Sequence, residues 1–194
     1  MNKEKIILVG GGGHCKSCID VIEKEGRFEI EGIVDLPEKV GSSILEYKII
    51  ASDDDLEELS KKYSNFLVTV GQIQSPGLRI NLFNKLIQLG VTLPVIKSPF
   101  AYISKYSRID KGTIIMHHVI INASAYIGEN CIINSKALIE HDAIVGNHCH
   151  ISTGAIVNGG VKVGSRTFFG SGAVSKQYIE ILEDSFVKAN SIVR

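Results

Sequence analysis

The sequence lacks an excess of charge of either sign, a long apolar run and a dense set of cysteines. Its 21 Lys and Arg balance 21 Asp and Glu, so we expect no sequence-independent binding of nucleic acid. No apolar stretch reaches the roughly 18 residues that suggest a membrane span. The first residues run into a short apolar segment and four glycines, which is no signal peptide. With only four cysteines in no disulfide framework, the sequence predicts a cytoplasmic location.

The second half of the chain carries a repeat of six residues. Starting at position 103, every sixth residue is large and apolar over twelve consecutive positions, which are Ile103, Ile109, Ile115, Ile121, Ile127, Ile133, Ile139, Val145, Ile151, Val157, Val163 and Phe169. Four residues after each of them stands a small or β-branched residue, from Ser107 to Ala173. This pattern is typical of a parallel β-helix, in which each hexapeptide forms one strand and three form one coil. Ser175 interrupts the series, which resumes at Ile181. We therefore expect about five coils, with a loop or irregular corner near residues 175–178.

The first half shows no such period. Apolar segments at residues 5–9, 29–34, 66–70 and 91–96 read as strands, and helical patterns cover residues 14–26, 53–63 and 75–89. Alternating strands and helices predict a small Rossmann-like α/β domain with a parallel sheet over residues 1–97. The β-helix would then form a second domain over residues 98–194.

Two features of the first half suggest a ligand site. Four glycines, residues 10–13, follow the first strand and precede a helix, where free N–H groups and the helix dipole favour an anion. Asp35 ends the second strand, and its carboxylate could accept hydrogen bonds from a ribose or a uracil. The alternative is a tight turn and an Asp without a ligand. Cys15 and Cys18 form a C-x-x-C pair that we interpret as helix packing rather than redox or metal chemistry.

A glycine-glycine-histidine turn in the α/β half, together with Ile139-Glu140-His141-Asp142 in the hexapeptide half, resembles one family. It is the PglD/NeuD-like family of bacterial hexapeptide-repeat acetyltransferases that act on nucleotide sugars. The resemblance implies a left-handed β-helix, a homotrimer, and transfer of acetyl from acetyl-CoA to the amino group of a UDP-linked amino sugar. The 4-amino-4,6-dideoxy type is expected, for surface glycan or glycoprotein sugars.

The resemblance also implies a role for each residue that matches the family's motifs. His141 stands where the general base stands, and Asp142 stands where a carboxylate raises the basicity of that histidine. Four residues match positions at acetyl-CoA, namely His150, Gly159, Ser171 and Ala189. Five match positions around the nucleotide sugar, namely Gly12, Gly13, His14, Asp35 and Asn134. No metal is expected.

The chemistry of the residues supports these roles independently. An amine must lose its proton as it attacks a thioester, and histidine is the side chain best matched to that task near neutral pH. A neighbouring carboxylate favours the imidazolium that forms. Gly159 follows His141 by 18 residues, so we expect it one coil directly above, where a bare backbone lets the thioester approach.

Several alternatives remain open at this point. The same base would serve O-acetylation of a sialic-acid-like sugar. A second alternative is a scaffold or sugar-binding protein without catalytic activity. Five of the six histidines, His117, His118, His141, His148 and His150, fall within 34 residues, so a zinc site of the γ-carbonic anhydrase type is a further possibility.

Overall fold

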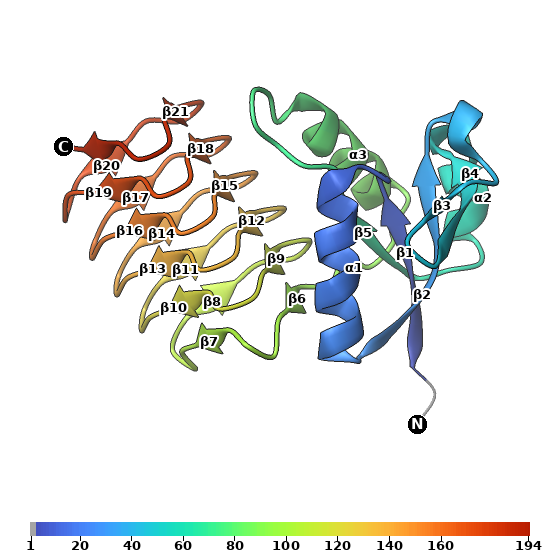
Figure 1. Ribbon diagram of the computed structural model, residues 1–194, viewed down its shortest axis with the longest axis horizontal. Helices are drawn as coiled ribbons and strands as arrows, with labels where there is room; N and C mark the ends of the chain where they lie inside the picture. The colour runs from blue at the N-terminus through green and yellow to red at the C-terminus, as the bar shows by residue number, and fades with distance from the viewer. Residues whose placement is uncertain (1–2) are drawn as a thin grey trace. The chain divides into compact units, whose positions relative to one another are not determined.

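The computed structural model describes residues 3–194, which form two compact units (Figure 1). The first unit runs to Gly71 and resumes over Gly77–Pro94, and the second contains Gln72–Pro76 and Val95–Arg194. An α/β unit is thus followed by parallel sheets stacked as in a left-handed β-helix, which confirms the predicted fold class. Among residues 3–194, no helix combines the length and the apolar character that a membrane span requires.

The first unit is built on a five-stranded sheet in the order β3-β4-β2-β1-β5. Its strands are β1 (Glu4–Val9), β2 (Phe28–Asp35), β3 (Ser43–Ile44), β4 (Tyr47–Ser52) and β5 (Asn65–Val68). Its α-helices are α1 (Gly13–Glu25), α2 (Leu56–Ser60) and α3 (Gly77–Gln88), and its 3-10 helices are η1 (Pro37–Lys39) and η2 (Asp53–Asp55). The strands pair in parallel except for the short hairpin of β3 and β4, so the sheet is mixed.

The core of the first unit lies where the parallel strands are covered on both faces. Ile6, Ile7, Leu8 and Val9 of β1 are all fully buried, as expected for a central parallel strand. Helix α1 buries one stripe of side chains, namely Cys15, Cys18, Ile19, Val21 and Ile22. Gly26 ends this helix in the left-handed conformation, a common helix terminus.

The structure differs from the expected elements of this half in two places. Residues 91–96 form no sheet strand; Thr92 makes one isolated bridge to Asn65, and Ile96 belongs to β6 (Ile96–Lys97), which pairs with β9 of the second unit. The hairpin of β3 and β4 was also not predicted, because strands of two and six residues carry too little periodicity.

The second unit is a stack of coils with three faces, and each face is a sheet of parallel strands. Face 1 contains β7 (Tyr102–Ile103), β10 (Ile120–Ile121), β13 (Leu138–Ile139), β16 (Ile156–Val157), β19 (Val174–Ser175) and β22 (Ile192–Val193). Face 2 contains β8 (Arg108–Ile109), β11 (Tyr126–Ile127), β14 (Ile144–Val145), β17 (Lys162–Val163) and β20 (Glu180–Ile181). Face 3 contains β6, β9 (Ile114–Ile115), β12 (Ile132–Ile133), β15 (His150–Ile151), β18 (Phe168–Phe169) and β21 (Phe186–Val187).

The interior of the coil stack follows the six-residue pattern. From Ile115 to Phe169 the large residues of the series are at most 2% exposed, and the small residues from Thr113 to Ala173 are equally enclosed. The prediction of an irregular corner near residues 175–178 is wrong, because the coil is regular there. Ser175 takes the interior position of β19 at 1% exposure, and its hydroxyl accepts a hydrogen bond from the N–H of Asn158 at 2.9 Å. A satisfied hydroxyl therefore replaces an aliphatic side chain without breaking the coil.

The turns between faces require a left-handed backbone. Every sixth residue from Gly112 to Asn190 has a positive φ, and only four of these residues are glycine. The others include Asp142 (φ 59°) and Tyr178 (φ 55°). Asn and Asp tolerate this conformation, whereas a bulky aromatic residue rarely adopts it.

Candidate active site

The candidate base lies at the corner between face 1 and face 2, where the chain passes from β13 to β14. The side chain of His141 is 51% exposed, and its Nδ1 lies 2.8 Å from Oδ2 of Asp142. Because a carboxylate only accepts hydrogen bonds, Nδ1 donates, and the lone pair of Nε2 is left to take a proton. This is the tautomer that a general base needs.

Gly159 lies against the imidazole ring from one coil above. A Cβ atom added at this glycine would be 2.8 Å from both Cε1 and Nε2 of His141. Any side chain would therefore push the ring away, whereas glycine leaves bare backbone beside Nε2. The N–H of Gly159 makes no hydrogen bond within residues 3–194, so it can donate to a ligand at this point.

Two residues next to this site, Glu140 and Tyr178, were not predicted from the sequence to belong to it. Glu140 accepts hydrogen bonds at Oε2 from Nδ2 of Asn122, at 2.8 Å, and from the N–H of His141, at 3.3 Å. Above Gly159, the ring of Tyr178 lies against Gly160, where an added Cβ would be 2.5 Å from Cε1 of the tyrosine. The signal was available, because Asn122 and Glu140, like Gly160 and Tyr178, are 18 residues apart.

His150 sits elsewhere, on face 3, and is 7% exposed. Its Nδ1 meets the carbonyl oxygen of Gln72 at 2.5 Å, and its Nε2 lies 3.1 Å from Nδ2 of Asn134. Nδ1 therefore donates to the carbonyl, and Nε2 accepts from the amide of Asn134. His150 thus holds the segment Gln72–Pro76, which we call the strap, through a contact between positions 78 residues apart, and Asn134 supports His150.

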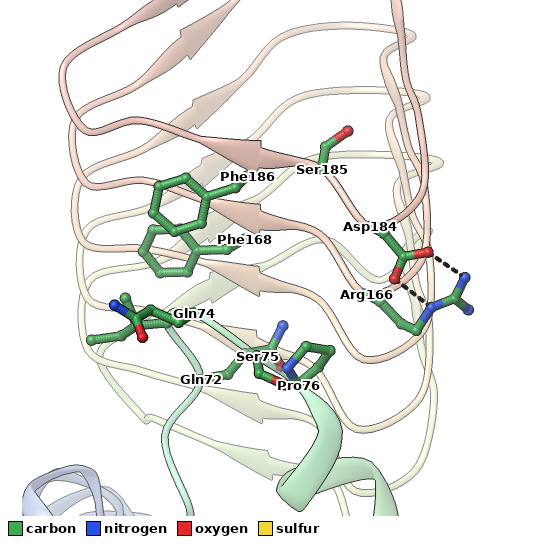
Figure 2. A pocket seen from close by; sticks show the side chains of 10 residues that line it. Gln72, Gln74, Ser75, Pro76, Arg166, Phe168, Asp184, Ser185 and Phe186 are labelled. Carbon is green, nitrogen blue, oxygen red and sulfur yellow. Dashed lines mark hydrogen bonds and ion pairs between the residues drawn. The ribbon is translucent and has the colours of Figure 1, made fainter.

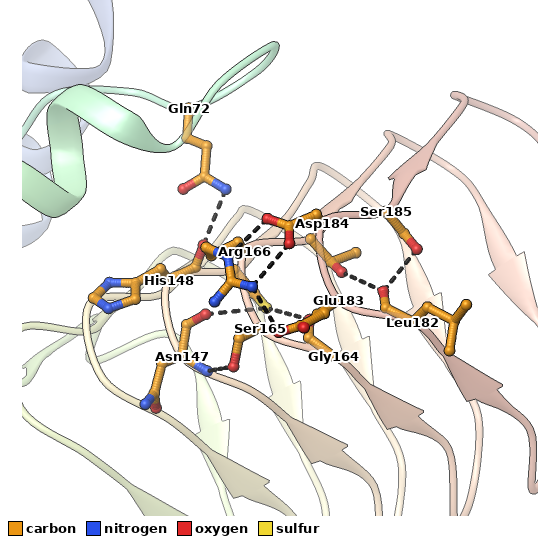
Figure 3. A network of polar contacts seen from close by, with 12 residues as sticks. Gln72, Asn147, His148, Gly164, Ser165, Arg166, Leu182, Glu183, Asp184 and Ser185 are labelled. Atoms are coloured by element: carbon orange, nitrogen blue, oxygen red, sulfur yellow. Dashed lines mark hydrogen bonds and ion pairs between the residues drawn. The ribbon is translucent and has the colours of Figure 1, made fainter.

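The strap closes one side of a cavity of about 190 Å³ (Figure 2). Phe168 and Phe186 stack on the opposite side with ring centroids 5.0 Å apart, and Phe168 meets the ring of His150 edge-on. Figure 3 shows the polar contacts at the neighbouring corner, where Gln72 donates to the carbonyl of His148 and Arg166 forms a paired contact with Asp184. None of the predicted site residues lines this cavity.

The remaining candidates for acetyl-CoA lie at the corner between face 3 and face 1. Ser171 follows β18, and its hydroxyl lies 2.9 Å from that of Ser152. Ala189 is exposed one coil above. In a single chain, the whole width of face 1 separates this corner from the one that carries His141 and Gly159.

The candidate residues of the first unit gather at the start of α1. Gly12 is its N-cap and Gly13 its first residue, both exposed and with no atom within 4 Å of an added Cβ. No side chain caps the helix there, and His14 is half-buried in its first turn. Gly12 and Gly13 thus border open space at the start of the helix.

Asp35 supports the glycine turn. Its Oδ2 accepts the N–H of Gly11 at 2.9 Å, and its Oδ1 accepts the N–H of Leu36 at 2.7 Å. Burial alone would raise the pKa of this carboxyl group. The hydrogen bonds from Leu36, from the ammonium group of Lys39 and from Gly11 outweigh burial and hold the pKa below its usual value. Asp35 is therefore ionised at neutral pH.

The histidines close in sequence do not gather in a single chain. His117 contacts Oγ of Ser98 through Nδ1 at 2.6 Å, and His148 contacts Asn130, while His141 and His150 belong to other parts of the coil. Within residues 3–194, no three His, Cys, Asp or Glu side chains are placed to hold a metal.

Cys15 and Cys18 are buried in the core of the first unit, in keeping with helix packing. Burial raises the pKa of Cys15 to about 11 and raises that of Cys18 as well, so neither is a thiolate at neutral pH.

Comparison with known proteins identifies the family. Residues 5–86 match the PglD N-terminal domain, and residues 124–159 match the bacterial transferase hexapeptide of six repeats. A histidine-to-asparagine variant of perosamine N-acetyltransferase from Caulobacter crescentus, solved with CoA and GDP-perosamine, is 30% identical at a TM-score of 0.92, covering 98% of this chain and 88% of that one. The chain belongs to the PglD-like hexapeptide acetyltransferases.

Membership in the PglD-like family makes the chain an enzyme of the sugar N-acetyltransferase class. The acetyltransferase domain of PglB from Neisseria gonorrhoeae, solved with acetyl coenzyme A, shares the fold at 24% identity and a TM-score of 0.90, with 99% of this chain and 93% of that one covered. No curated protein matches the chain significantly.

Proposed function

We propose that this PglD-like chain transfers acetyl from acetyl-CoA to the amino group of a nucleotide-linked amino sugar, with His141 as general base. One observation carries the proposal: an exposed imidazole is oriented through Nδ1 by Asp142 while its Nε2 faces the bare backbone of Gly159. The complex of the Caulobacter relative with CoA and GDP-perosamine supports the same chemistry.

The geometry accounts for each step of acetyl transfer. The amine attacks the thioester carbonyl while Nε2 of His141 takes its proton, and Asp142 stabilises the imidazolium. The N–H of Gly159 would donate to the tetrahedral oxyanion. When the intermediate collapses, the carbon–sulfur bond breaks, and the imidazolium returns the proton to the leaving thiolate of CoA. We keep His150, Ser171 and Ala189 as proposed contacts of acetyl-CoA, and Asn134 as a proposed contact of the acceptor.

We propose that the nucleotide binds at the open start of α1. The N–H groups of Gly12 and Gly13, which no side chain caps, suit a diphosphate. His14 follows them in the chain, and Asp35 accepts the N–H of Gly11 just before them. The family resemblance implies a UDP sugar of the 4-amino-4,6-dideoxy type. Because the Caulobacter relative holds a GDP sugar, the test includes both UDP-linked and GDP-linked sugars.

A homotrimer is proposed as the active form. The outward residues of face 1 are all apolar, namely Tyr102, Ile120, Leu138, Ile156, Val174 and Ile192, and Tyr102 and Ile192 are 62% and 69% exposed. Face 2 instead presents Arg108, Lys162 and Glu180 among its outward residues. Packing of face 1 against a second copy would cover this apolar stripe and bring one copy's candidate CoA corner towards another copy's base. Four free, buried cysteines suit the proposed cytoplasmic location.

The experiment is an acceptor screen with acetyl-CoA, in which thiol release and product mass are both recorded. UDP- and GDP-linked amino sugars form the main arms, and a sugar with only hydroxyl groups tests O-acetylation. The proposal expects a product heavier by one acetyl group on an amino sugar. Sugar binding without thiol release from any acceptor would instead support a non-catalytic binding protein.

A further inference from the structure

Tyr178 is an exposed aromatic residue at one of the left-handed turns of the coil. It has a positive φ of 55°, and its side chain is 73% exposed. Its hydroxyl makes no hydrogen bond within the described part of the chain.

The ring of Tyr178 is nevertheless held in place. The edge of the ring formed by Cδ1 and Cε1 lies against Gly160, whose missing side chain makes room for it. The N–H of Tyr178 donates to the carbonyl of Gly159 at 3.0 Å, and the N–H of Gly160 donates to the carbonyl of His141, also at 3.0 Å. Tyr178, the two glycines and His141 therefore form one hydrogen-bonded column.

The column brings two exposed rings to the same stretch of bare backbone. His141 lies against Gly159 from below, and Tyr178 lies against Gly160 from above. Consecutive coils are about 4.8 Å apart, so the two residues sit roughly 10 Å apart along the stack and their rings lean towards each other. A sugar whose amine reaches Nε2 of His141 and that extends along these glycines comes within reach of the tyrosine ring.

We propose that Tyr178 is a specificity-determining residue that packs its ring against the apolar face of the acceptor sugar. This rests on the proposed function, because it assumes that the amine is deprotonated at His141. An aromatic ring offers an apolar surface with little entropy to lose on binding, which suits a sugar that has lost hydroxyl groups. The ligand class is therefore an amino-deoxy sugar.

The test replaces Tyr178 with residues that separate strain from contact. Tyr178→Asn should fold at least as well as the parent, because Asn tolerates a positive φ, as Asn130 and Asn190 do in equivalent turns. We expect its KM for the acceptor to rise about 10-fold or more, the loss of roughly 1.4 kcal/mol of contact. The KM for acetyl-CoA should stay unchanged. Tyr178→Phe keeps the ring and should retain the parent's KM.

Tyr106→Asn is the matched control. Tyr106 is 68% exposed at the same corner, but it lies two coils below Asp142, away from the glycines. Tyr106→Asn should leave the KM for the acceptor and the KM for acetyl-CoA unchanged. The proposal is overturned if Tyr178→Asn leaves the acceptor KM unchanged, if it raises only the KM for acetyl-CoA, or if it changes the oligomeric size. A parent chain that acetylates no amino sugar would overturn the proposed function itself, which is a distinguishable outcome.

Discussion

Replacing Gly159 with Ala tests the relation between the base and the backbone above it. The new Cβ would lie 2.8 Å from Cε1 and Nε2 of His141, whereas carbon atoms pack at about 3.5–4.0 Å. The ring must therefore move by roughly 1 Å, and because its side chain is 51% exposed, it can do so by swinging outwards. Gly159 has no positive φ, so Ala adds no backbone strain.

A displacement of this size disturbs both the contact with Asp142 and the position of Nε2. Misplacement of a reacting group by about 1 Å can cost 100-fold in rate, which corresponds to about 2.7 kcal/mol of activation free energy. We expect Gly159→Ala to lower kcat/KM by about that factor in the thiol-release assay. The melting temperature should stay within a few degrees of the parent's, because the imidazole is a surface group. A stable variant with near-parental activity would show that the bare backbone at Gly159 does not position the imidazole.

Two further predictions concern the first unit. Cys15 and Cys18 should resist alkylation at pH 8 in the folded protein and react after unfolding, because both are buried and the pKa of Cys15 is raised to about 11; rapid labelling of the native chain, read by mass, would contradict this. Asp35→Asn should lower the free energy of unfolding by about 1–3 kcal/mol at pH 7. Since the folded pKa of Asp35 lies below its ordinary 3.8, this stabilisation is present above pH 4 and disappears as the pH falls below that value, so the two melting curves should converge in acid. A difference that persists at pH 2 would contradict the ionic contribution.

The β-helix was predictable because its determinants are local. Each hexapeptide forms one strand and one turn, so the period of Ile, Val and Phe specifies the coil without knowledge of distant residues. The same arithmetic placed Gly159 over His141. Ser175 misled the prediction because an interior serine reads as a break, whereas the N–H of Asn158 satisfies its hydroxyl.

The parts that escaped prediction depend on contacts distant in sequence or on backbone conformation. Nothing in the sequence near His150 indicates that its Nδ1 is bound by the carbonyl of Gln72, 78 residues away. Likewise, Tyr178 reads as an ordinary surface residue until its positive φ and its contact with Gly160 are known. The short hairpin of β3 and β4 was missed because two to six residues carry too little periodicity.

The central claim is that the imidazole of His141 takes the proton of the attacking amine. The most direct measurement is single-turnover acetyl transfer by His141→Ala at saturating acetyl-CoA and acceptor, with the oligomeric size recorded alongside. We expect a loss of at least 100-fold with the assembly intact. Transfer at close to the parental rate would show that another group accepts the proton.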